Sequence, residues 1–162
     1  MGGKWIELLK ETAPRLSRAL VIYGYDNPIY LPSMRTLADR IGVTLIDPHI
    51  RKTEQIESAI AAVAQTPDGG VITMPGNFTG PRRSHILELI ARHRMPSIHG
   101  FRNYVTEGGL ISYGVDAPEI FRRSASYVDR ILRGANPGDL PIQLPTRIRV
   151  GHQPQNRQGA WS

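Results

Sequence analysis

The segment from Gly70 to Gly80 constrains the fold most, because an apolar run gives way to a loop and then to a helix start within a few residues. Residues 71–74 (VITM) have the continuous apolar character of a strand that is buried on both faces of a parallel sheet. Pro75 and Gly76 end this run, and Pro81 is well placed to begin an amphipathic helix. The pattern predicts a central parallel strand whose carboxyl end carries a loop, where open α/β sheets place their ligands.

Apolar runs and amphipathic segments alternate along most of the chain, which predicts an α/β fold. We expect a three-layer sandwich in which helices cover both faces of a mainly parallel sheet, with right-handed crossovers. Besides 71–74, strands are predicted at 19–23, 43–46, 97–99 and 110–113, with an edge strand at 141–144. Helices are predicted near the amino terminus and at 31–41, 53–65, 81–93 and 117–133. The last helix is expected to face the core with Ile120, Phe121, Ala125, Val128 and Leu132.

Composition and charge exclude several classes of protein. With 162 residues, 40% of them hydrophobic and 21% charged, the chain suits one globular domain. No apolar run approaches the roughly 20 residues that span a bilayer, so we expect no membrane-spanning segment. The net charge of +6 is scattered rather than interleaved with aromatic residues, so no nucleic-acid partner is expected. The absence of cysteine excludes disulfides and thiolate metal sites.

Aromatic and polar residues follow four of the predicted strands at their carboxyl ends. Six of the eleven aromatic residues gather there, and small-ligand sites combine such a lining with a few placed polar groups. The alternative is that the Asp, Asn and Gly residues serve turns and that the aromatic residues cap the core. The predicted ligand-binding residues are Tyr25, Asn27, Asn77, Phe78, Thr79, Phe101, Tyr113 and Asp116.

Signatures of catalysis are weak in this sequence. The loop 76–80 precedes a helix and could cradle a phosphate, but it lacks the Lys-Ser/Thr end of a P-loop. His85 and Glu88 lie three residues apart with no second histidine at metal-binding spacing, so no metal site is predicted. We expect no enzyme and no cofactor. The alternative is a stand-alone flavodoxin-like enzyme domain that binds a phosphate or nucleotide at 76–80.

Three long segments carry a resemblance to a known family. KWIELLKETAPRLSRALVIYGYDNP, ITMPGNFTGPRRSHILELIARHRMPSIHGFRNYVTEGGLISYGVD and FRRSASYVDRILRGANPGDLPIQLPT resemble the carboxyl-terminal half of ABC-transporter substrate-binding proteins with the periplasmic-binding-protein type I fold. The most specific pieces are GGLISYG and YVDRILRGANPGDLPIQLPT. The resemblance covers residues 4–147, nearly the whole chain.

The resemblance implies a single Rossmann-like lobe of a two-lobed protein. Such proteins enclose a small solute, in some members an aromatic amino acid, and deliver it to a membrane permease. The loops at Asn27, Asn77, Phe78, Phe101 and 113–116 would then face the ligand. The backbone would cross to the other lobe near Gly114, so that the helix 117–133 would pack on that lobe. The intact parent would be periplasmic, whereas this chain carries no export signal and is expected in the cytoplasm if expressed as it stands.

The last residues depart from the resemblance, which gives expected domains of 1–147 for the lobe and 148–162 for a disordered or frameshifted tail. Members of the family continue after Arg147 as a strand and helix resembling FELVINLKTAKALGL, whereas this chain reads IRVGHQPQNRQGAWS. One permitted set of codons for residues 149–162 reads ELVINLKTAKALG in the next frame. We therefore expect a frameshift product that lacks the amino-terminal lobe, and the genomic DNA tests this hypothesis.

Overall fold

Six strands form one sheet in the order β2-β1-β3-β4-β5-β6. The computed structural model describes residues 2–24, 28–142 and 148–152. Strands β1 to β5 are parallel to their neighbours, whereas β6 pairs antiparallel with β5. The strands are β1 Arg18–Ile22, β2 Thr44–Ile46, β3 Gly69–Thr73, β4 Ser97–His99, β5 Ile111–Val115 and β6 Ile148–His152. The predicted three-layer α/β sandwich with a mainly parallel sheet is confirmed.

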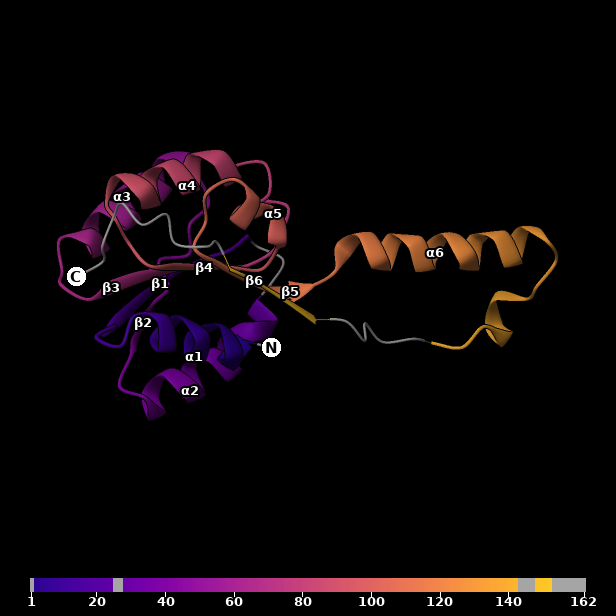
Figure 1. Cartoon of the computed structure of the whole chain (residues 1–162), viewed down its shortest axis with the longest axis horizontal. Coiled ribbons are helices and arrows are strands. Elements are labelled where there is room, and N and C mark those ends of the chain that lie inside the picture. Colours follow the sequence, from indigo (N-terminus) through magenta and orange to yellow (C-terminus); the bar gives the residue numbers. More distant parts are fainter. Residues whose placement is uncertain (1, 25–27, 143–147, 153–162) are drawn as a thin grey trace.

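Helices cover both faces of this sheet (Figure 1). On one face α1 (Gly2–Thr12) and α2 (Leu31–Arg40) bury a cluster around Trp5, and on the other α3 (Thr53–Ala64) and α4 (Arg83–Arg92) bury a second cluster around Ile56. The short α5 (Arg102–Thr106) lies on the same side as α4. Two 3-10 turns occupy Pro28–Tyr30 and Pro137–Asp139. Each strand of the centre is therefore enclosed on both sides, as its apolar sequence requires.

The strand order places a topological switch between β1 and β3. The chain leaves β1 toward β2, then returns past β1 to β3 and continues to β4 and β5. The carboxyl ends of all five parallel strands meet at one edge of the sheet, which we call the carboxyl edge. In sheets of this order, ligands bind at the carboxyl edge beside the switch point.

The long helix α6 (Ala117–Leu132) differs from the prediction, because none of its residues is buried. Phe121, Val128 and Leu132 are 75%, 54% and 82% exposed, although they were expected to face the core. The helix projects from the body of the molecule, and the chain turns back beside it over residues 133–142 (Figure 1). The helix has the apolar face that was predicted, but no other described element covers this face.

The chain after α6 also differs from the prediction. Pro141 and Ile142 are not part of a strand, and residues 143–144 of the predicted edge strand lie outside the described residues. Residues Ile148–His152 form β6, not a disordered tail, because the free edge of β5 offers backbone partners. Residues 153–162 also lie outside the described residues, and the frameshift hypothesis stays a prediction.

Candidate functional site

The loops at the carboxyl edge are packed backbone to backbone, and glycines make this possible. A Cβ on Gly24, just after β1, would lie 2.7 Å from the Cβ of Phe78 in the loop after β3. A Cβ on Gly114 would collide with the carbonyl oxygen of Gly100, which follows β4. Larger residues would push these strands apart. The exits of β1, β3, β4 and β5 therefore form one continuous surface.

The loop 76–80 is held in place from inside by Thr79. The Thr79 hydroxyl donates to the carbonyl oxygen of Met74 at 2.8 Å, and the Thr79 carbonyl accepts a hydrogen bond from the Tyr104 hydroxyl at 3.0 Å. Both side chains are buried, and burial raises the pKa of Tyr104. Thr79 thus ties the β3 loop to α5, and its hydroxyl is enclosed rather than turned to solvent.

Several amides of this segment are already used by the backbone. The amides of Gly80, Arg82 and Arg83 donate to the carbonyl oxygens of Gly76, Thr79 and Gly80. A phosphate-binding loop presents its amides to the anion instead. The folded geometry therefore offers little support for a phosphate or nucleotide at 76–80.

An aromatic ring and a guanidinium lie together beside the switch point. The Arg82 guanidinium carbon sits 4.3 Å from the centre of the Phe78 ring, and Arg82 also donates to the Thr53 hydroxyl and the Phe78 carbonyl. These bonds fix the half-buried Phe78 ring at the start of α4. A fixed, partly exposed ring offers a flat apolar contact to a ligand.

The structure brings the described members of the predicted site to the same edge. Asn77 is exposed and Phe78 half-buried after β3, while Phe101 is half-buried where it precedes α5 after β4. Tyr113 lies on β5, with its carbonyl accepting from the Trp5 indole at 2.6 Å, and Asp116 directly precedes α6 at the N-cap position. Tyr25 and Asn27 lie outside the described residues.

A second group at the carboxyl edge was missed by the sequence reasoning. Asp47 and His49 follow β2, the one parallel strand whose exit was not considered. The Tyr23 hydroxyl, after β1, lies 3.1 Å from His49 Nδ1. Burial first and then the Asp47 carboxylate raise the pKa of Tyr23 to about 12. The signal available in the sequence was an Asp-Pro-His turn directly after a predicted strand.

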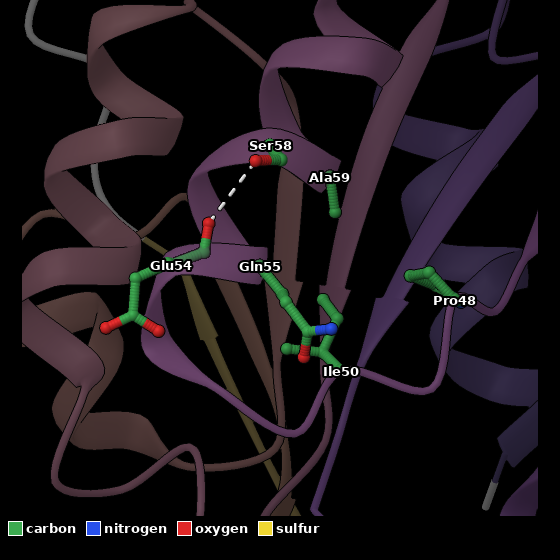
Figure 2. Close-up of a pocket in the computed structure, with 6 residues that line it drawn as sticks. All are labelled: Pro48, Ile50, Glu54, Gln55, Ser58 and Ala59. Atoms are coloured by element: carbon green, nitrogen blue, oxygen red, sulfur yellow. Dashed lines mark hydrogen bonds between the residues drawn. The ribbon is translucent and has the colours of Figure 1, made fainter.

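An open pocket of about 390 Å³ lies against the first half of α3 and the loop after β2 (Figure 2). Pro48 and Ile50 line it from the loop, together with Glu54, Gln55, Ser58 and Ala59 of α3. None of the eight predicted site residues lines this pocket. The pocket therefore lies beside the predicted site residues of the carboxyl edge and not among them.

The described part of the chain contains no group of three or more His, Cys, Asp or Glu side chains that could hold a metal ion. No helix in residues 2–24, 28–142 and 148–152 is long and apolar enough to cross a membrane.

Comparisons with known proteins give a consistent picture. The model of the family described as "ABC transporter substrate binding protein" matches residues 3–149. No curated protein matches the chain. A conserved domain protein of Vibrio cholerae superposes with a TM-score of 0.77 at 24% identity, over 91% of this chain and 50% of that one.

Two further solved structures are similar at lower identity. The ABC domain of Streptococcus pneumoniae, solved in complex with L-Trp, gives a TM-score of 0.78 at 17% identity over 92% of this chain and 52% of its own. An ABC sugar transporter subunit from Rhodobacter sphaeroides gives a TM-score of 0.61 at 15% identity, over 94% of this chain and 61% of its own. The chain thus spans about half the length of the first two solved chains.

Proposed function

This chain belongs to the family of ABC transporter substrate-binding proteins, and we propose that it supplies one wall of a solute-binding cleft. The fold is that of a periplasmic-binding-protein lobe, and its solved neighbours include two such proteins. The solute would be captured between this lobe and a second one, and closure of the two would precede delivery to a membrane permease. The intact protein would act outside the cytoplasmic membrane.

The observation that carries this proposal is the convergence of four strand exits beside the β1/β3 switch point. Gly24 contacts the Phe78 loop, Gly100 contacts Gly114, and Phe78 is fixed by Arg82. Rigid strands thus present loops with apolar rings and polar groups to one side, as pre-formed small-ligand sites do. We propose Asn77, Phe78, Phe101, Tyr113 and Asp116, with Tyr25 and Asn27, as the wall that faces the solute, and Thr79 as the residue that supports its loop from within.

The solute class is proposed to be a small polar or aromatic molecule such as an amino acid. The Phe78 ring would cover an apolar part, and exposed Asn77 would donate to or accept from a polar part. The protein would bind without catalysis, as the substrate-binding family it belongs to implies. The amides of Gly80, Arg82 and Arg83, at the end of the loop and the start of α4, donate within the backbone, which speaks against the phosphate-binding alternative.

Saturation-transfer NMR with a solute panel tests this function. The panel holds aromatic and branched amino acids, glucose and octanoate, each offered to the 162-residue chain. One wall supplies only part of the contacts, so we expect amino acids to bind with a Kd on the order of 1 mM, about −4 kcal/mol. Tight binding by this chain would show that a second wall is dispensable, and silence across the whole panel would contradict solute binding.

A further inference from the structure

The projecting helix α6 carries an apolar stripe that no other described element covers. Phe121, Ala125, Val128 and Leu132 recur at intervals of three or four residues, which aligns them along one face of the helix. All four residues are exposed. Contiguous apolar surface exposed on a soluble protein marks an interaction site. These four residues, which we call the α6 stripe, are therefore a candidate docking surface.

The returning chain lies along a different side of the helix and leaves the α6 stripe open. The Tyr127 hydroxyl donates to the carbonyl oxygen of Pro141 at 2.6 Å, so the returning chain runs on the Tyr127 side. Ile120, seven residues before Tyr127 and on the same side, is half-buried. The centre of the stripe lies about a third of a turn around the helix from Tyr127. A second macromolecule can therefore reach the stripe (Figure 1).

The charges on one border of the α6 stripe select how two copies of the helix would pair. Arg122 and Asp129 lie seven residues apart on this border. In a parallel pair each residue would face its own copy, so that like charges would meet. In an antiparallel pair Arg122 of one copy faces Asp129 of the other, and the twofold symmetry makes this contact twice. The charge pattern therefore favours an antiparallel pair.

These charges are free to exchange partners. Within the chain Arg122 pairs with Glu119, and Asp129 pairs with Arg133 at 2.9 Å. Both ion pairs lie on the exposed surface of one helix, where such pairs contribute little to stability. Replacing them by contacts between two helices therefore costs little.

The small side chains in the middle of α6 suit a close crossing of two helices. Ala125 lies midway between Arg122 and Asp129, so the antiparallel pairing places it against its own copy at the crossing point. Phe121 of one helix then falls between Val128 and Leu132 of the other. Small residues at the crossing let helix axes approach to about 8 Å, at the short end of the usual range.

The shape of the molecule leaves room for this pair. With 16 residues α6 is about 24 Å long, and it projects from the body of the molecule (Figure 1). An antiparallel pair places the two sheets at opposite ends of the paired helices, whereas a parallel pair would bring them side by side. One helix on another buries less than the roughly 1,200–2,000 Å² of a standard interface, so the contact would be weak and reversible.

We infer that the α6 stripe docks antiparallel on the α6 stripe of a second copy of this chain. The dimer is held by Phe121, Val128 and Leu132 of each copy and is oriented by the two contacts between Arg122 and Asp129. None of the proposed solute-binding residues belongs to the stripe, so the inference is independent of the proposed function.

Sedimentation equilibrium of the 162-residue chain tests the inference. We expect the mass to rise with concentration from 18.0 kDa toward twice that value, with a Kd on the order of 100 μM. Phe121→Asp should weaken the dimer at least tenfold, because it places a charge in the apolar contact. Ile29→Asp is the matched control, since Ile29 is as exposed as Phe121, at 75%, but lies in the 3-10 turn before α2. This control should dimerise like the parent.

Charge exchange tests the orientation of the pair. Asp129→Arg should weaken the dimer about tenfold, because it sets an arginine against Arg122 of the other copy. The double variant Asp129→Arg with Arg122→Asp should recover most of the affinity of the parent. In a parallel pair the single variant would leave like charges facing each other and would not weaken the dimer.

Three results would overturn the inference. The first is a parent chain that stays monomeric up to about 1 mM, roughly tenfold above the expected Kd. The second is a Phe121→Asp variant that dimerises like the parent. The third is an Asp129→Arg variant with unchanged affinity, which would rule out the antiparallel pair.

Discussion

Among single residues, His99 stands out because it is a fully buried imidazole in the middle of the sheet. Its Nε2 lies 3.0 Å from the Ser97 hydroxyl, and its ring stacks on Tyr104 with 4.6 Å between centroids. Within the described structure its Nδ1 has no partner, nor has the Thr73 hydroxyl opposite it on β3. Burial lowers the pKa of His99 to about 3. His99 is thus neutral in the folded protein across the physiological range.

This burial predicts how stability depends on pH. The unfolded chain binds a proton at His99 below its ordinary pKa of about 6.5, whereas the folded chain does not until about pH 3. The contribution of buried, neutral His99 to the free energy of unfolding is therefore complete above pH 6.5 and is lost as the pH falls from there toward 3. The loss should amount to about 1.4 kcal/mol per pH unit in that window.

Urea unfolding at pH 7 and pH 5 measures this effect. The parent should lose unfolding free energy between pH 7 and pH 5. The variant His99→Gln should lose about 2 kcal/mol less over the same interval. His93→Gln, which changes an exposed histidine, should show the same decrease in unfolding free energy as the parent. An identical pH dependence of His99→Gln and the parent would show that His99 is not the titrating group.

At the scale of elements, α6 is the helix whose stability the fold does not explain. It has a continuous apolar face and no buried residue. Its described ties are local: Glu119 pairs with Arg122 and Arg123, Asp129 pairs with Arg133, and the Tyr127 hydroxyl donates to the Pro141 carbonyl. Helices of this length are marginal in water without tertiary packing. The missing cover is what the family resemblance assigns to a second lobe.

Hydrogen–deuterium exchange tests this view of α6. In dilute solution we expect the amides of α6 to exchange at least tenfold faster than those of α1, which packs with Trp5 and Leu9 in the core. The comparison is internal, because both helices belong to one chain. Protection of α6 equal to that of α1 would mean that something covers its apolar face. If self-association supplies that cover, the variant Phe121→Asp should remove the protection of α6.

The order of elements could be predicted from the sequence, because apolar runs and capping signals are local. Gly42 does end α2 in the left-handed conformation, with a φ of 69°. The burial of α6 could not be predicted, since amphipathicity shows that a face needs cover but not which element supplies it. Strand β6 was missed because its pairing depends on the open backbone edge of β5, not on side-chain pattern.

The candidate site was predictable only in part. Turn residues after strands mark the exits, and parallel topology brings the exits of Asn77, Phe101 and Tyr113 to one edge. The contacts of Tyr23 with Asp47 and His49 were not found, because they join the exits of two strands and depend on packing and not on spacing. Thr79 shows the converse, since its hydroxyl, a plausible ligand contact in the sequence, supports the loop from within.

At the scale of the whole molecule, the chain folds around one sheet, its loops gather at the carboxyl edge, and no other described element covers the apolar face of α6. The sheet and its two cores are complete, so the lobe does not need a partner to position its loops. The similar solved chains are about twice as long. We propose that solute binding divides between this lobe and another, with the switch point of β1 and β3 at its centre.

Protein-observed NMR with L-phenylalanine tests that central claim most directly. In two-dimensional amide spectra of the labelled chain, we predict that the largest shift changes fall on residues that follow the parallel strands, at 23–24, 47–50, 76–80, 100–104 and 113–116. Amides at the opposite edge, such as Ser17 and Asp68, should stay unchanged. Shift changes confined to that opposite edge, or to the exposed face of α6, would contradict a solute site at the carboxyl edge.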